Sequence, residues 1–153
     1  MLTSRTKNLY QELILEHNKK PRNYRVPETS SHQAKGHNPL CGDKLDVYLS
    51  VDEESSTISD VSFIGDGCAI SKASASIMTT MVKGKSVEEA QSLFKMFHDM
   101  TTGKETDVTE DQIPSRLRVF AGVKDLPARV KCATLAWHTL DAALQGEEKI
   151  STE

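Results

Sequence analysis

Residues 65–71 read Gly65-Asp66-Gly67-Cys68-Ala69-Ile70-Ser71 and mark the point where the pattern of the chain changes. Before this stretch, residues 45–51 alternate apolar side chains with polar or aromatic ones, and residues 58–64 are rich in β-branched and aromatic types. The polar segment 53–57 between them is typical of a turn. The sequence therefore predicts a β-hairpin that ends at Gly65.

After the same stretch the residues become small side chains and helix formers. This pattern runs from Ala69 to Val82 and is followed by Gly84, at a position typical of the residue after a helix. A helix is thus predicted directly after the hairpin. Cys68 is expected where the strand passes into that helix.

Three further helices are predicted from apolar periodicity and end signals. Residues 4–17 form an amphipathic pattern. Ser86 and Glu89 have the spacing of a capping box at the start of a helix that stops before Gly103. Residues 127–146 begin with proline and end with glycine, as the last helix, and place Cys132 in its first turn.

The remaining segments complete a single domain over residues 1–146. Residues 19–39 contain prolines and no clear period, so we expect a long connection laid across the core. Residues 147–153 are expected to be a frayed C-terminal tail. The fold class predicted is α+β, with a small antiparallel sheet of about three strands packed with helices.

Composition excludes several classes of function. The chain has 153 residues, 19 Lys and Arg against 22 Asp and Glu, and a net charge of −3 with both signs interspersed. Such a surface offers no basic field for nucleic acid. We find no apolar run of membrane-spanning length and no export signal, so we expect a cytoplasmic protein with no membrane partner.

The three cysteines are the residues with the clearest chemical potential. Cys41, Cys68 and Cys132 cannot all pair with one another, and cytosolic chains seldom use disulfides, so they are expected to be thiols, metal ligands or nucleophiles. Gly42 lets the backbone bend so that Cys41 and Asp43 face one ion. Cys68 and Cys132 are both expected at helix starts, where unpaired N–H groups favour a thiolate.

Three thiolates and one carboxylate form a donor set that suits Zn²⁺ or iron–sulfur chemistry better than Mg²⁺ or Ca²⁺. Arg129, three residues before Cys132, can offset part of the negative charge of this set. From spacing alone the cysteines could equally be small buried apolar residues. Asp43 could be a solvated turn residue, and Arg129 could simply face water.

Three sequence blocks resemble the IscU/SufU family. They are Asn38-Pro39-Leu40-Cys41-Gly42-Asp43, the run from Gly65 to Ser76, and Arg129-Val130-Lys131-Cys132-Ala133. His17 and Pro21-Arg22-Asn23 resemble the N-terminal segment of the family. Within it, the chain looks like the SufU branch, because Lys131 and not histidine precedes Cys132, the stretch between Cys68 and Cys132 is longer, and the chaperone motif Leu-Pro-Pro-Val-Lys is absent.

The resemblance implies a zinc-dependent sulfurtransferase of iron–sulfur cluster assembly, with Zn²⁺ on Cys41, Asp43, Cys68 and Cys132. Cys41 would accept persulfide sulfur from a pyridoxal-phosphate cysteine desulfurase of the SufS type, supported by Arg129. The sulfur would pass to downstream scaffold components of the SUF machinery. Whether such an acceptor counts as an enzyme in its own right is left open.

Two other interpretations remain at this stage. The same cysteines could carry a nascent, transient [2Fe–2S] cluster on an assembly scaffold. Alternatively, the metal could be zinc that only stabilises the fold.

Overall fold

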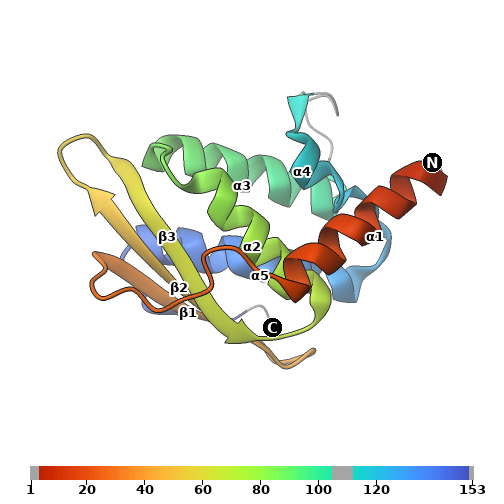
Figure 1. The fold of residues 1–153 in the computed structure, drawn as a ribbon, viewed down its shortest axis with the longest axis horizontal. Coiled ribbons are helices and arrows are strands. Elements are labelled where there is room, and N and C mark those ends of the chain that lie inside the picture. Colours follow the sequence, from red (N-terminus) through yellow and green to blue (C-terminus); the bar gives the residue numbers. More distant parts are fainter. Residues whose placement is uncertain (1–3, 105–111, 152–153) are drawn as a thin grey trace.

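The structure is a computed structural model that describes residues 4–104 and 112–151, with side chains from Glu12 onward. Most of the elements are labelled in Figure 1. Along the chain they are α1 (Ser4–Lys19), β1 (His32–Asn38), β2 (Asp43–Asp52), β3 (Thr57–Asp66), α2 (Ala69–Val82), α3 (Val87–Thr102), α4 (Ser115–Arg118), the 3₁₀ helix η2 (Ala121–Asp125), α5 (Pro127–Leu144) and β4 (Lys149–Ser151).

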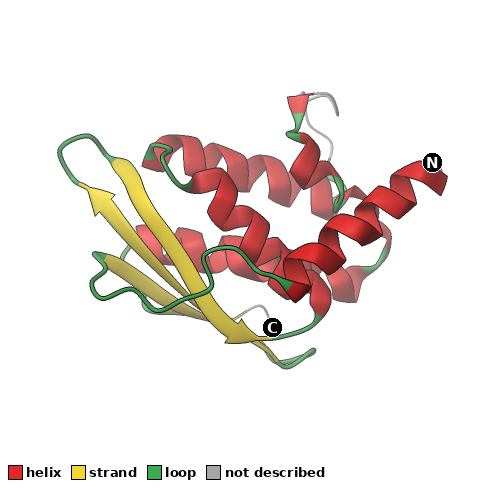
Figure 2. Cartoon of the chain, viewed as in Figure 1, coloured by secondary structure: helices red, strands yellow, loops and turns green. Residues whose placement is uncertain are grey.

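A four-stranded sheet in the order β3-β2-β1-β4 forms one layer of the fold. β2 pairs antiparallel with both β1 and β3, and β4 runs parallel to β1. The helices gather on one side of this sheet (Figure 2), with α5 against β1 and β2 and with α2 against β3. The predicted α+β class is confirmed.

Alternation along β2 explains which face of the sheet the helices cover. Leu45, Val47 and Leu49 are at most 1% exposed, whereas the residues between them face outward. Burial of each such side chain contributes about 1.5–3 kcal/mol. Across the core, the rings of Phe97 on α3 and Trp137 on α5 stack at 5.1 Å, so α3 packs on the far side of α5 from the sheet.

The helix ends follow the signals in the sequence. α2 covers the predicted range Ala69–Val82 with Cys68 as its N-cap. The capping box before α3 is formed: the Glu89 N–H donates to Ser86 Oγ at 3.0 Å, and the Ser86 N–H donates to Glu89 Oε1 at 3.2 Å. Together these bonds satisfy two N–H groups that a helix start leaves unpaired.

The position of β1 was not predicted, because this strand lies inside the segment that we expected to be a connection. Its inward residues Ala34, Gly36 and Asn38 are small or polar and carry no β-branched signal. The small residues are required by α5, since a Cβ on Gly36 would collide with the side chain of Thr139. Because α5 packs closely on β1, the inward side chains of this strand are small. The strand therefore lacks the alternating apolar pattern that identifies most strands.

The expectation of a frayed tail is wrong for Lys149–Ser151, which form β4. These residues pair in parallel with residues 35–37 of β1, and the Lys35 N–H donates to Glu148 O at 2.8 Å just before the strand. Without β4, the N–H and C=O groups along the outer edge of β1 would have no strand beside them. Three residues of the tail supply hydrogen-bond partners for part of this edge. Residues 152–153 lie outside the described part of the chain.

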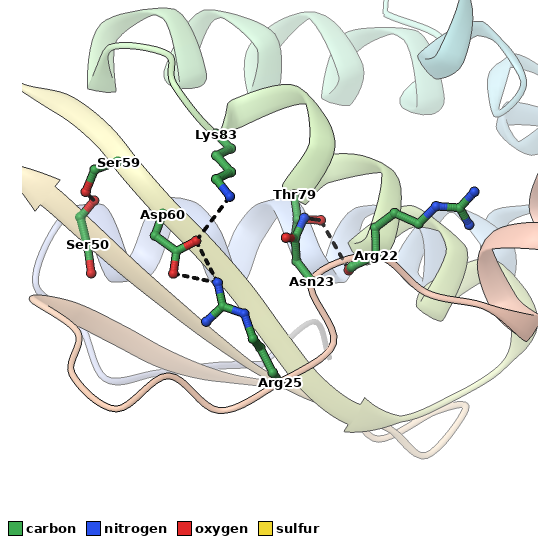
Figure 3. Close-up of polar contacts among 8 residues, drawn as sticks. All are labelled: Arg22, Asn23, Arg25, Ser50, Ser59, Asp60, Thr79 and Lys83. Carbon is green, nitrogen blue, oxygen red and sulfur yellow. Dashed lines mark hydrogen bonds and ion pairs between the residues drawn. The ribbon is translucent and has the colours of Figure 1, made fainter.

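The remainder of the predicted connection is fastened to the fold by polar contacts (Figure 3). Arg25 donates to both carboxylate oxygens of Asp60 on β3 at 2.7 Å, and Lys83 lies 3.6 Å from the same carboxylate. Asn23 Nδ2 donates to Thr79 Oγ1 on α2 at 2.9 Å. The segment therefore bridges the edge strand and α2 instead of hanging free.

Within the described residues, none of the helices combines the length and the apolar character needed to cross a bilayer.

His17 joins α1 to α2 in the interior. It is 6% exposed, and its Nδ1 lies 2.6 Å from Ser76 Oγ, which also accepts the Arg22 N–H at 2.8 Å. Burial, followed by the positive charge of Arg22, lowers the pKa of His17. A proton on this ring is therefore less favourable in the folded protein than in the unfolded chain.

This burial predicts acid sensitivity. The contribution of His17 to stability is fully present above its unfolded pKa of about 6.5 and is lost as the pH falls through its lower folded pKa. We expect His17→Gln, which does not titrate, to flatten part of the dependence of the free energy of unfolding on pH below about 6.5. Urea unfolding at several pH values measures this effect. A difference between wild type and variant that stays constant with pH would contradict it.

Candidate metal centre

Three of the four expected ligands meet at one end of the sheet. The ligand atoms of Cys41, Asp43 and Cys132 all lie within 4.8 Å of one another, and we call these residues the Cys–Asp–Cys cluster. The Sγ atoms of Cys41 and Cys132 are 3.4 Å apart. This is much longer than a disulfide of about 2.05 Å and close to the roughly 3.8 Å that two thiolates on one tetrahedral Zn²⁺ would show.

A tight turn between β1 and β2 presents Cys41. The Gly42 N–H donates to the Asn38 carbonyl at 2.9 Å, and Gly42 has a φ of 75°, which glycine adopts without the steric cost of a Cβ. The bend at Gly42 leaves Cys41 exposed, while Asp43 enters β2 fully buried. The expected role of the glycine between the two ligands agrees with this geometry.

Cys68 lies beside the cluster at the junction of β3 and α2. Its Sγ caps the helix by accepting the Ser71 N–H at 3.4 Å, and its own N–H donates to Asp43 Oδ1 at 2.9 Å. The side chain is partly exposed. Cys68 is not among the three residues whose ligand atoms lie within 4.8 Å of one another. Its N–H contacts Asp43 and its thiol contributes to the raised pKa of Cys132, so Cys68 lies at the edge of the same site.

Cys132 differs from the expectation. α5 begins at Pro127, so Cys132 lies in the second turn and not at the free N–H groups of the helix start. It is fully buried, and this burial is the main cause that raises its pKa far above the ordinary range, with hydrogen bonds to Cys41 and Cys68 adding to the effect. Without a metal the thiol is therefore protonated, and it donates to Cys41 Sγ.

Arg129 lies one helical turn before Cys132, on the side of the thiols. A hydrogen bond with Cys132 is the main cause that raises the pKa of Arg129, followed by the charges of Cys68 and Cys132. The guanidinium is thus the positive group that faces the sulfur atoms. The supporting role of Arg129 stays a prediction.

Two residues of the site were missed by sequence reasoning. Asn38 is fully buried and donates from Nδ2 toward both Asp43 and Cys132. A Cβ on Gly67 would lie 2.8 Å from Asp43 Oδ1, so only glycine leaves room for the carboxylate. Both occur inside the quoted blocks, where they are indistinguishable from ordinary turn residues.

A separate groove of about 640 Å³ lies on the face of the sheet that the helices leave open. Its lining includes Lys35, Lys44 and Lys149, and it contains none of the three cysteines. The three cysteines therefore lie outside this groove, and the thiol chemistry of the chain is concentrated at the end of the sheet.

The space around Gly67 yields a prediction. The methyl group of Gly67→Ala meets the Asp43 carboxylate, so we expect zinc affinity to fall about 10–100-fold while the protein remains folded. Competition with a chelator measures the affinity.

The matched control is Gly84→Ala, which strains a φ of 85° where nothing lies within 4 Å. It should lower stability by about 1 kcal/mol and leave zinc affinity unchanged. Equal zinc affinity in the two variants would show that the space at Gly67 is irrelevant to the metal.

Comparison with known proteins shows which family the chain belongs to. The family model of the NifU-like N-terminal domain matches residues 9–152. The zinc-dependent sulfurtransferase SufU of Bacillus subtilis is 41% identical over 92% of both chains. The iron–sulfur cluster assembly scaffold protein IscU of Streptococcus pyogenes is 37% identical over 95% of this chain and 88% of its own.

A solved structure agrees in fold. The N-terminal part of a nitrogen-fixing NifU-like protein from Brucella abortus has a TM-score of 0.79 and covers 94% of this chain and 96% of its own at 21% identity. With the sequence blocks, the Cys–Asp–Cys cluster and the family match over residues 9–152, the chain belongs to the NifU N-terminal family of iron–sulfur cluster assembly proteins, which includes IscU and SufU.

Proposed function

We propose that this protein is a zinc-dependent sulfur acceptor that takes persulfide sulfur from a cysteine desulfurase and passes it to the SUF machinery. The observation that carries the proposal is the unequal exposure of the cluster. Cys41 is exposed, whereas Asp43 and Cys132 are fully buried beside it. One ligand is therefore accessible to a partner, while the others are held by the fold.

Zinc fits the donor set. Cys41, Asp43, Cys68 and Cys132 would hold it, since three sulfur donors with one carboxylate suit this ion and the two central sulfur atoms are 3.4 Å apart. When bound, zinc would supply the positive charge that keeps these thiols deprotonated. The raised pKa of Cys132 means that metal binding must displace its proton into solvent or a neighbouring base.

The sulfur transfer itself requires only thiol exchange. The Cys41 thiolate attacks the outer sulfur of the persulfide on the donor, a new S–S bond forms on Cys41, and the S–S bond of the donor breaks. The donor cysteine leaves as a thiolate, so no external oxidant or reductant is needed. Because Cys41 is exposed, a partner can reach its sulfur atom, and Cys41 would be the ligand that leaves the metal and reacts as the thiolate.

A protein donor suits the surface around Cys41. Leu40, directly before it, is 67% exposed. Apolar side chains beside a reactive group are typical of a docking site. The partner proposed is a pyridoxal-phosphate cysteine desulfurase of the SufS type.

Assignment to the SufU branch rests on sequence. Lys131 occupies the position before Cys132 where histidine is expected in IscU-type scaffolds, and the chaperone motif of those scaffolds is absent. The similarity to the zinc-dependent sulfurtransferase of Bacillus subtilis supports the same branch.

Substitution of Cys41 tests the acceptor role. Because the side chain is exposed, we expect Cys41→Ser to remain folded and to lose acquisition of sulfur from the desulfurase by at least about 100-fold, since serine is a far weaker nucleophile toward sulfur. Radiolabelled sulfur transfer and thermal unfolding measure the two properties. A variant that still takes up sulfur at the normal rate would exclude Cys41 as the acceptor, and a variant that unfolds would favour a purely structural metal.

Arg129 provides a second test. Since the guanidinium faces the thiols from an exposed position, Arg129→Ala should retain zinc and lose most of the stimulation of the desulfurase. The matched control is Lys131→Ala on the same helix. Full stimulation by the Arg129 variant would remove this residue from the mechanism.

The alternative function is an assembly scaffold, favoured by the similarity to IscU proteins at 37% and 36% identity. It predicts iron and acid-labile sulfide in the purified protein, with a cluster that moves to an apo-protein. One zinc per chain together with acceleration of cysteine desulfuration is the outcome expected for the sulfur acceptor.

A further inference from the structure

We infer that Asn38 is a positioning residue that holds Asp43 and Cys132 in the arrangement required to bind the metal. The inference rests on the proposed metal site and adds to it a residue that ligates nothing. It is carried by the contacts of a single fully buried side chain at the last position of β1.

The Asn38 amide group reaches two ligands from two different elements. Its Nδ2 donates to Asp43 Oδ2 on β2 at 3.4 Å and to Cys132 Sγ on α5 at 3.8 Å. Both contacts are long, as expected for one amide shared between a carboxylate and a large sulfur atom. One amide group therefore contacts two of the proposed ligands at once.

Asn38 also completes the restraint of the Asp43 carboxylate. One oxygen, Oδ1, accepts the Cys68 N–H at 2.9 Å from the start of α2, and the other, Oδ2, accepts from Asn38. With both oxygens held, the carboxylate cannot rotate freely, and its remaining lone pairs stay directed toward the cluster. Hydrogen bonds of this kind to metal ligands commonly change metal affinity 10–100-fold.

The carbonyl oxygen of the Asn38 side chain indicates that fold stability alone does not account for an asparagine at this position. Within the described part of the chain, Asn38 Oδ1 has no hydrogen-bond partner, although the residue is 0% exposed. An unpaired buried carbonyl oxygen costs about 1–3 kcal/mol, and an apolar side chain of the same shape would avoid that cost. The N–H donor at Nδ2 is thus what asparagine provides at this position and an apolar residue of the same shape would not.

The turn that carries Cys41 does not depend on this side chain. It is closed by the backbone carbonyl of Asn38, which accepts the Gly42 N–H at 2.9 Å, and Asn38 pairs with Asp43 through the strand register. Substitution of the side chain therefore leaves the turn and the strand pairing in place. This separation allows the positioning role to be tested without loss of the fold.

The test compares Asn38→Leu, which matches the shape of asparagine without polar atoms, with Asn38→Ala. In both variants we expect zinc affinity, measured by competition with a chelator, to fall about 10–100-fold. Cobalt substitution gives a second readout, since loss of the hydrogen bond to Cys132 should shift the sulfur-to-cobalt charge-transfer absorption. Zinc-free Asn38→Leu should unfold close to the wild-type midpoint, because it loses an unpaired oxygen together with the donor.

The matched control is Ser62→Ala. This variant also removes a fully buried side-chain oxygen that has no hydrogen-bond partner in the described structure. Ser62 lies on β3, four residues before Asp66, the last residue of that strand. It should leave zinc affinity and the cobalt spectrum unchanged. Wild-type affinity and an unshifted spectrum in both Asn38 variants would overturn the positioning role. Failure of the wild-type protein itself to bind zinc would instead overturn the proposed function.

Discussion

The hydrogen bond from the Cys68 N–H to the Asp43 carboxylate joins the sheet to the start of α2. It connects the start of β2 to the N-cap of α2 at 2.9 Å, at the end of the sheet where Cys41 and Cys132 meet. The bond requires Gly67, because any Cβ there would occupy the space of the carboxylate. A buried carboxylate needs hydrogen-bond donors, so the corner between β3 and α2 and the metal centre depend on the same contact.

The metal centre beside this corner combines buried residues with an exposed one. Asp43 is fixed within the sheet and Cys132 within a buried helix, whereas Cys41 projects from a turn into solvent. Arg129 adds a positive charge on the exposed side. A site built only for structure would have no need to expose one of its sulfur ligands, and this asymmetry is the reason why we propose sulfur transfer and not structural zinc.

Elements with a strong local signal were predictable from the sequence. The hairpin, α2 and the capping box before α3 follow from alternation, small residues and the Ser86–Glu89 pair, all of which act over a few residues. β1 and β4 were not predictable in this way. β1 has small inward residues because α5 packs closely on it, and β4 has only three residues, whose pairing depends on a strand more than a hundred positions earlier.

The sequence by itself determined the residue types of the centre, three thiols and a carboxylate with glycine between Cys41 and Asp43, and so restricted the chemistry to soft metal or sulfur. Only the tertiary structure decided which of them meet and in what state. It placed Cys132 in a buried second turn, which raises its pKa, and it brought Asn38 between two ligands. These properties arise from contacts between residues far apart in the chain, which no local pattern records.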